Sequence, residues 1–514
     1  MFFYVIWGFF CMDQLNQIII VLGLLLGIFN FHKSVQFIVG LFFKPKTFQE
    51  TDVRKRYGIV IPARNEEKVI GNLIESIHQQ AYDQNLIEIF VVADNCNDKT
   101  AEIARQMGCH VYERFDETKK RKGWALEYLF QQIEKDYGIT SFDAYFVFDA
   151  DNLLDVNYIH EMNKAFVENK NIVTSYRNSK NFETNWVSSA YAIHFYGRTV
   201  YNHRPRQLMG TGTHLAGTGF MISSHLLKDG WNYHSLTEDS ELTMYMTAQN
   251  VKIGYCEAAI HYDEQPTSFK VGFRQRVRWT RGRLVVFAKT WKMLFKGIFK
   301  HKSFTNYDML FYIMPYPLLT FLLNVTYATA SLVIGIWVTH NFSWKAVLIG
   351  FGTYWGSSYV SNLARAALIV YRERKQIHCS FYKTLFYVCL SPWFSLISIF
   401  LMIVALFGDV EWVPVKHDDA RKIQDINQKS ISLVPSTKQP LRFHMILQGF
   451  GLLLILVAIL AFAAIRQFNL FSWSLAVCLK YTLVPALPSG LIFVLFGLMI
   501  QKTNKNESKL KRVR

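Results

Sequence analysis

Long apolar runs set the strongest limit on how this chain can fold. The run 17–43 can cross a hydrocarbon core of about 30 Å at about 1.5 Å per helical residue. Further runs lie in the second half of the chain, at about 307–337, 346–371, 380–408, 444–466 and 470–500. Only 18% of the 514 residues are charged, whereas soluble domains carry about 25%. These features predict a membrane protein and exclude a disordered chain, a collagen and a small secreted scaffold.

The chain is basic, with 56 Lys and Arg residues against 39 Asp and Glu residues and a net charge of +17. No zinc-finger spacing or RNA-binding aromatic signature accompanies this surplus, so we expect no nucleic acid partner and favour anionic lipids or a charged nucleotide. Seven cysteines are scattered without a CxxC pair, which argues against a disulfide framework or structural zinc. The oligomeric state has no sequence signal.

Clusters of basic residues predict which loops face the cytoplasm. They lie at 372–375, across 409–443 and in the tail 501–514, and such clusters favour the cytoplasmic side. The chain is therefore predicted to be a multi-pass protein of the cell membrane, with residues 54–283 in the cytoplasm. Residues 1–53 would be an N-terminal transmembrane anchor. A cleaved signal peptide is the alternative, but the required positive charge and cleavage site are missing.

Residues 54–283 have the composition of a soluble α/β domain. Short β-branched runs at 58–62, 87–94, 109–113 and 144–148 alternate with amphipathic stretches predicted as helices at 67–80, 100–107 and 123–137. This alternation is typical of a doubly wound sheet, which binds ligands beyond the carboxyl ends of its strands.

An interfacial helix is predicted over 284–306. Its lysines share helical spacing and oppose an apolar face, although a plain surface helix is the alternative. These lysines are Lys289, Lys292, Lys296 and Lys300.

Residues 307–408 are predicted to contain transmembrane and re-entrant spans. The stretch 380–408 has basic loops on both sides and Pro392 in its middle, so we expect a bend there and either a re-entrant segment or an interfacial helix with a short span. A cytosolic segment at 409–443, a transmembrane hairpin at 444–500 and the basic cytosolic tail 501–514 follow. Within the hairpin, Lys480 either precedes a helix start or faces a polar path.

Asp149 and Asp151 directly follow the apolar run that ends at Phe148. Two carboxylates at the ligand edge of a sheet can hold a hard divalent cation, Mg²⁺ or Mn²⁺, which takes its other oxygens from a substrate diphosphate. Glu238 and Asp239 form a second acidic pair. Glu238 fits a capping box with Ser235, whereas the functional interpretation makes Asp239 a general base among other acidic groups.

Gln275, Arg278 and Trp279 share one helical face because they are spaced i, i+3 and i+4. The indole can stack on a sugar ring, and the guanidinium can grip phosphate oxygens. The glycine-rich run 210–219 lacks the Lys-Ser/Thr ending of a P-loop. It instead allows close backbone approach to an acceptor in the stretch Gly217, Thr218 and Gly219.

Eight motifs in this order resemble the family 2 glycosyltransferases, specifically the membrane-embedded processive branch that includes cellulose, chitin and hyaluronan synthases. The resemblance covers about 55–290 and implies a Rossmann-like GT-A domain combined with an α-helical transmembrane bundle. The motifs are Pro62–Glu66, Asp94, Lys122, Asp149–Asp151, Gly217–Gly219, Thr237–Asp239, Glu264–Ser268 and Gln275–Trp279.

The resemblance also implies roles for individual residues. Glu66, Asp94 and Lys122 would hold the uridine and diphosphate of a UDP-sugar. Asp149 and Asp151 would bind the metal, and Asp239 would deprotonate the acceptor. Gln275, Arg278 and Trp279 would close over the donor diphosphate and the terminal acceptor sugar. In this family the anomeric centre is inverted, so a UDP-α-sugar would yield a β-linkage.

Two further features bear on the resemblance. The segment 412–417, Trp-Val-Pro-Val-Lys-His, loosely resembles the gating segment of the family. Arg64 and the stretch 93–96 depart from the common pattern, which leaves the uracil contacts open.

The predicted function is an inverting, processive polysaccharide synthase. It would transfer sugar from a UDP-sugar, with UDP-glucose favoured over UDP-N-acetylglucosamine, to a growing β-linked glycan such as a capsule or exopolysaccharide, and move the product across the membrane. A non-processive enzyme making a glycolipid is one alternative, and an inactive translocation scaffold is another.

Overall fold

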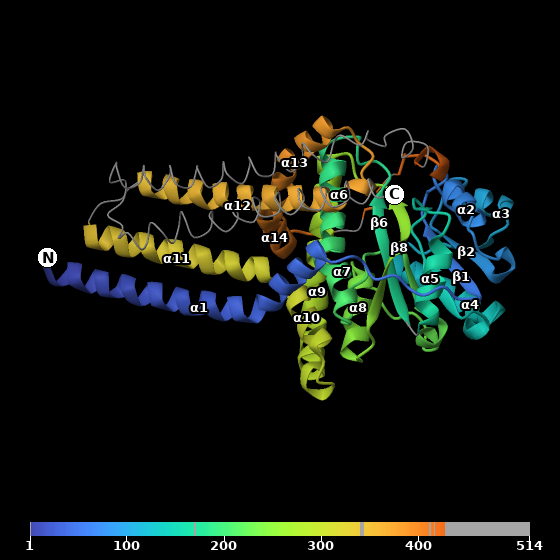
Figure 1. Ribbon diagram of the computed structural model, residues 1–514, viewed down its shortest axis with the longest axis horizontal. Helices are drawn as coiled ribbons and strands as arrows, with labels where there is room; N and C mark the ends of the chain where they lie inside the picture. Colours follow the sequence, from blue (N-terminus) through green and yellow to red (C-terminus); the bar gives the residue numbers. More distant parts are fainter. Residues whose placement is uncertain (1, 169–170, 340–343, 411–412, 416, 427–514) are drawn as a thin grey trace, which may run out of the picture. The chain divides into compact units, whose positions relative to one another are not determined.

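The computed structural model describes residues 2–168, 171–339, 344–410, 413–415 and 417–426 (Figure 1). They lie within one compact unit that extends to Lys429. The predicted hairpin 444–500 with Lys480, the tail 501–514, and residues 411–412, 416 and 427–443 of the predicted cytosolic segment lie outside the described residues.

The first half of the sheet has the predicted doubly wound form. Its strands all run parallel in the order β3-β2-β1-β4, and each forms where a short β-branched run predicted it. They are β1 (Tyr57–Ala63), β2 (Ile87–Asp94), β3 (His110–Arg114) and β4 (Ala144–Val147). Their alignment brings the carboxyl ends of β1, β2 and β4 to one edge.

Helices cover both faces of these strands. The apolar side of α2 (Ile70–His78) packs with α3 (Thr100–Gln106) and with Ile59 and Ile61 of β1. On the opposite face, α4 (Lys122–Asp136) packs against Val60. Successive side chains of β1 thus point to opposite faces, and both faces are buried. This explains why the strand is apolar throughout, since neither face is exposed to water.

The second half of the sheet was not predicted. There β7 (Phe220–Ser223) runs antiparallel to both β4 and β6 (Ile172–Ser179), and β8 (Ile253–Asp263) runs parallel to β6 and pairs with the two-residue β5 (Leu153–Leu154). The carboxyl ends of β6 and β8 therefore lie at the same edge as that of β4. Helices of this half are α5 (Tyr158–Val167), α6 (Trp186–Arg198), α7 (Arg204–Leu208) and α8 (Glu238–Ala248).

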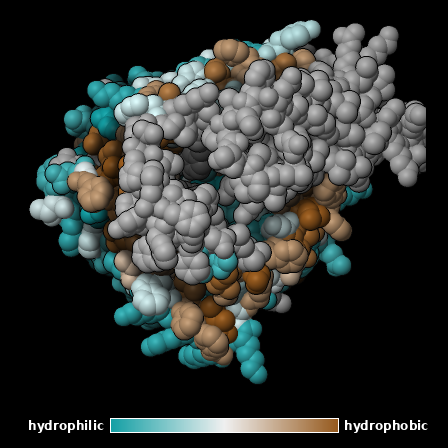
Figure 2. All heavy atoms as spheres, turned by 90° about the vertical axis from the view of Figure 1, so that its left-hand side faces the viewer, coloured by the Kyte–Doolittle hydropathy of each residue, from teal (hydrophilic) through white to brown (hydrophobic). Residues whose placement is uncertain are grey.

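The remaining helices include the predicted membrane elements. Figure 1 shows α1 and α11 extending away from the sheet, and the two helices pack against each other. Figure 2 shows the molecule from the side toward which these helices extend. Apolar side chains gather on the part of the described surface that is visible there, and hydrophilic residues surround them. The helices are α1 (Phe2–Phe42), α9 (Phe269–Lys300), α10 (Phe304–Ile313), α11 (Tyr316–Thr339), α12 (Trp344–Arg372), α13 (Phe381–Leu396) and α14 (Ser398–Phe407).

Among the described residues, the stretch Phe381–Phe407 is long and apolar enough to cross a membrane, by length and composition. The multi-pass arrangement stays a prediction. A bend at Pro392 was expected; α13 includes this residue and ends at Leu396, and the bend itself stays a prediction. The Ser391 hydroxyl donates to the Val388 carbonyl at 2.9 Å and so replaces the hydrogen bond that the proline cannot make.

Candidate active site

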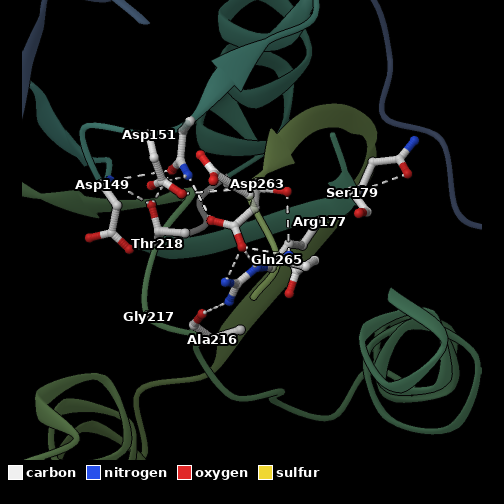
Figure 3. Close-up of polar contacts among 12 residues, drawn as sticks. Asp149, Asp151, Arg177, Ser179, Ala216, Gly217, Thr218, Asp263 and Gln265 are labelled. Carbon is white, nitrogen blue, oxygen red and sulfur yellow. Dashed lines mark hydrogen bonds and ion pairs between the residues drawn. The ribbon is translucent and has the colours of Figure 1, made fainter. Parts of the chain in front are cut away.

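Three carboxylates converge at the carboxyl edge of the sheet. Asp149 and Asp151 lie in the loop after β4, and Asp263 ends β8 (Figure 3). One oxygen atom from each lies within 4.8 Å of the others. Asp263 was missed by the sequence reasoning, because its position beside Asp151 depends on the pairing of β8 with β6. Its place at the end of a β-branched run was the available signal.

The three carboxylates lie in a closely packed polar network. Asn152 Nδ2 donates to Asp263 Oδ1 at 2.9 Å, and Arg177 Nε donates to Asp263 Oδ2 at 3.0 Å. Asp151 is 3% exposed; burial raises the pKa of its carboxyl, and Asp263 and Asp149 raise it further. An all-oxygen set of this kind fits the preference of Mg²⁺ or Mn²⁺, because a divalent cation offsets the repulsion among the carboxylates.

Lys122 connects the acidic loop to the glycine-rich turn. This residue begins α4, and its Nζ donates to Asp149 Oδ1 at 2.5 Å and to the Gly217 carbonyl at 2.8 Å. Thr218 is 1% exposed, and its hydroxyl accepts the Asp149 N–H at 2.8 Å. Gly217 and Gly219, with φ of 88° and 64°, thus bring Thr218 next to the Asp149–Asp151 loop. Contact of this turn with an acceptor stays a prediction.

The acidic pair Glu238–Asp239 begins α8. The predicted capping-box alternative is wrong: the N-cap is Thr237 with no side-chain cap, and Glu241 instead accepts the Ser235 N–H at 2.8 Å. Glu238 is 9% exposed. Burial raises the pKa of its carboxyl and Asp239 raises it further, while Lys122 opposes them.

The residues predicted to share one face do lie on one helix, α9. Arg278 Nη1 donates to the Leu236 carbonyl at 3.3 Å. Burial lowers the pKa of Arg278, and its interactions with Glu238, Asp239 and Asp149 raise it. All three carboxylates therefore lie within the electrostatic range of this arginine.

The other two members of the α9 face differ in their surroundings. Gln275 has a buried Oε1 atom without a hydrogen-bond partner among the described residues, which leaves an acceptor free for a ligand. Trp279 packs edge-on against Tyr191 at 5.9 Å between ring centroids and against Phe195 at 6.2 Å.

Glu66 and Asp94, which follow β1 and end β2, are both already engaged. Arg114 Nη1 donates to Asp94 Oδ1 at 2.5 Å. His417 Nδ1 donates to Glu66 Oε1 at 2.9 Å, and its Nε2 lies 3.9 Å from Asp151 Oδ2. Burial disfavours the charged imidazolium, but Asp151 and Glu66 outweigh it and raise the pKa of His417 to about 10.

The segment that carries His417 is docked on the domain. The backbone N–H groups of Asp418 and Asp419 donate to the Glu264 carboxylate, each at 3.2 Å. Ile423 and Ile426 are buried against Leu153 and Tyr262. The sequence singled out 412–417 by resemblance, but it did not predict that His417 reaches the acidic loop.

Comparisons with known proteins relate this chain to glycosyltransferases. Residues 55–282 match the family model described as "Glycosyltransferase like family 2". The chain is 25% identical to the probable glycosyltransferase YdaM of Bacillus subtilis (strain 168), over 58% of this chain and 71% of that protein. It is 22% identical to a beta-monoglucosyldiacylglycerol synthase of Trichormus variabilis (strain ATCC 29413 / PCC 7937), over 50% of this chain and 54% of that protein.

A solved structure of the mannosyltransferase PcManGT from Pyrobaculum calidifontis, in complex with GDP-Man and Mn²⁺, aligns with a TM-score of 0.45 and 14% identity, covering 77% of this chain and 99% of that one. The chain spans about half the length of the glucolipid synthases that it matches. Residues 55–282 thus match a glycosyltransferase family 2 model on a Rossmann-like sheet, and the protein is a glycosyltransferase.

Proposed function

We propose that this protein transfers a sugar from a UDP-sugar, UDP-glucose first among them, to a hydroxyl group of an acceptor at the membrane, with inversion of the anomeric carbon. The observation that supports this most is the charge arrangement at one edge of the sheet. There the Asp149–Asp151 loop contacts Lys122, and the Glu238–Asp239 pair lies within electrostatic reach of Arg278. Such an arrangement suits a diphosphate leaving group and a base on neighbouring elements.

Asp149, Asp151 and Asp263 would hold Mg²⁺ or Mn²⁺. A bound cation of this kind neutralises the negative charge that develops on the departing UDP. The chain also supplies positive charge of its own, because Lys122 and Arg278 would contact the diphosphate. Glu66 and Asp94 would contact the uridine part of the donor from the ends of β1 and β2.

Asp239 would act as the general base. It is half-buried and more accessible than Glu238. The raised pKa of Glu238 lessens the repulsion between the two adjacent carboxyls. The acceptor oxygen would attack the anomeric carbon as its proton passes to Asp239, and the bond to the diphosphate would break on the opposite side of the carbon. Gln275 and Trp279 would orient the reacting sugars from α9.

The relatives favour a single addition to a lipid acceptor, because three of them are named beta-monoglucosyldiacylglycerol synthases. Processive synthesis and translocation of a polysaccharide form the second candidate. It is favoured by His417, which belongs to the segment that resembles a gating segment and lies beside Glu66.

The test uses the full chain in lipid nanodiscs with UDP-glucose and Mn²⁺. Wild type should release UDP, and Asp239→Asn should lower the rate by about 10²-fold or more, as expected for loss of a general base. Asp229→Asn, an exposed acid remote from the site, serves as the matched control and should leave the rate unchanged. Undiminished transfer by Asp239→Asn would remove this base, and the size of the product separates a glycolipid from a polymer.

A further inference from the structure

Four arginines on α6 and α9 have no carboxylate within ion-pair distance among the described residues, and two of them, Arg198 and Arg278, interact electrostatically with Asp239. Within the described part of the chain, none of them makes an ion pair: Arg278 donates to a carbonyl, Arg276 donates to the Ser398 hydroxyl at 3.2 Å, and Arg283 donates to the Tyr312 carbonyl at 2.6 Å. Arg198, at the end of α6, contacts only the ring of Phe195, 5.4 Å from the centroid. Uncompensated charge in a largely buried region is costly, so these arginines point to an anionic ligand.

Arg198 is the most informative of the four. Its side chain is half-buried, and it makes no hydrogen bond with the described residues. Its electrostatic neighbours include Tyr312, Arg283 and Asp239. An unpaired guanidinium thus lies within electrostatic range of the proposed base, in the region where an acceptor must bind to present its hydroxyl group.

A buried histidine lies in the same region. His214 is 1% exposed, and neither of its ring nitrogens has a hydrogen-bond partner within the described residues. Its ring stacks on Tyr312 with centroids 4.2 Å apart, and Arg283 lies over that same tyrosine at 4.8 Å. Arg198 and Arg283 both act on His214 electrostatically. Two unpaired imidazole nitrogens and guanidinium groups without a carboxylate partner therefore occur in the same region, which is expected of a binding site for a ligand.

The donor does not account for all of this charge. In the proposed function, Lys122, Arg278 and a divalent cation face the two acidic phosphates of the UDP-sugar. Arg198 and Arg283 remain in excess. Two guanidinium groups offer planar, forked donors that match phosphate oxygens, so the excess charge suits a second phosphate group.

One of the four arginines, Arg276, adjoins apolar helices. The Arg276 guanidinium lies 3.6 Å from the ring centroid of Phe394 in α13, and it bonds to Ser398 in α14. These helices form the stretch Phe381–Phe407, which is apolar and long enough to span a membrane. A phosphate group bound beside them would suit the head group of a lipid whose chains lie in the membrane.

We propose that Arg198 and Arg283 bind the phosphate of the acceptor, and that the acceptor is a hydroxyl-bearing phosphoester lipid such as one with a glycerophosphate head group. This inference rests on the proposed function. The head-group hydroxyl oxygen bonds to the anomeric carbon, the bond from that carbon to the β-phosphate oxygen breaks, UDP leaves with the electron pair, and the hydroxyl proton passes to Asp239. The phosphoester itself stays intact.

The experiment compares two acceptors for the full chain in nanodiscs with UDP-glucose: dioleoylphosphatidylglycerol and the neutral dioleoylglycerol. Wild type should prefer the anionic lipid. Arg198→Gln should raise the KM of the enzyme for that lipid at least tenfold. The KM for UDP-glucose and the rate of transfer to the neutral lipid should each change less than twofold. Arg198→Lys should recover part of the loss. The matched control is Arg274→Gln, an exposed arginine on α9, which should behave as wild type.

Other outcomes would overturn the inference. An equal effect of Arg198→Gln on both acceptors, or a wild-type preference for the neutral lipid, would show that no acceptor phosphate binds there. Stimulation of transfer to dioleoylglycerol by inorganic phosphate would identify a site for free phosphate instead. UDP release without preference for the anionic lipid would leave the proposed function standing, whereas no UDP release with any acceptor would overturn both.

Discussion

At the scale of single residues, the turn beneath the acidic loop has little room. A Cβ atom added at Gly219 would lie 2.2 Å from Cε1 of His261, which is 1% exposed, and the backbone there has a φ of +64°. At Gly217, with a φ of +88°, an added Cβ would meet nothing within 4 Å. The two positions share the strain of a left-handed backbone, but only Gly219 adds a steric clash.

We therefore expect Gly219→Ala to lower the free energy of unfolding by about 3 kcal/mol or more, from backbone strain and overpacking together. Gly217→Ala should cost only about 1 kcal/mol, because strain alone acts there. Thermal or denaturant unfolding of both variants in the same detergent measures the difference. Equal losses would show that the His261 ring can move aside.

Some residues of the candidate site could be predicted from the sequence, and others could not. Asp149, Lys122 and Arg278 were predicted from local motifs, and the structure places them within reach of one another. Asp263 and His417 were not predicted as site residues. Each reaches Asp151 through a contact between segments distant in the chain, and the sequence near either residue does not specify that contact.

At the scale of secondary-structure elements, strands β1, β2 and β4 could be predicted because each is a short apolar run bounded by turn residues. The antiparallel insertion of β7 between β4 and β6 could not be predicted, since the four residues of β7 show no distinctive pattern. A bend at Pro392 stays a prediction, although the helix includes this residue. The hydroxyl of Ser391 completes the hydrogen bonding locally, and α13 ends at Leu396.

The attachment of the segment 417–426 to the domain can be tested by mutation. The segment is docked on the domain largely by Ile423 and Ile426, each 6% exposed. Burial of such a side chain contributes about 1.5–3 kcal/mol, so Ile423→Asn should loosen the segment. Hydrogen exchange at the amides of Asp418 and Asp419 should then speed up about tenfold or more.

Lys422→Ala is the matched control, because Lys422 is 53% exposed and makes a surface ion pair with Glu75, and such pairs contribute little. Exchange in β1 should stay unchanged in both variants. If Ile423→Asn left the amides of Asp418 and Asp419 protected, the contacts of the segment with Glu264 would suffice to hold it.

At the scale of the whole molecule, one buried carboxylate joins the N-terminal helix to the catalytic domain. Asp308 in α10 accepts hydrogen bonds from Gln36 Nε2 at 2.7 Å and from Arg206 Nε at 2.7 Å, and its Oδ1 lies 3.2 Å from His32 Nε2. Its side chain is fully buried, and that of Arg206 is 1% exposed. One carboxylate of α10 therefore connects α1 and α7, which are distant in sequence, and it neutralises the buried charge of Arg206.

Removing one member of this cluster should be far more damaging than removing the pair. Asp308→Ala leaves the buried Arg206 unpaired and should lower the free energy of unfolding by about 3–5 kcal/mol. Arg206→Met combined with Asp308→Leu should recover much of that loss, because apolar side chains of similar size carry no desolvation penalty. Unfolding of the single and double variants in detergent micelles measures both effects.

The control for Asp308 is an exposed ion pair that also links the N-terminal region to the domain. Lys46 and Glu168 are 2.8 Å apart, with side chains 36% and 34% exposed, and Glu168→Ala should cost about 1 kcal/mol or less. If Asp308→Ala cost no more than Glu168→Ala, the attachment of α1 to the domain would rest on apolar packing, and the buried charges would contribute little to it.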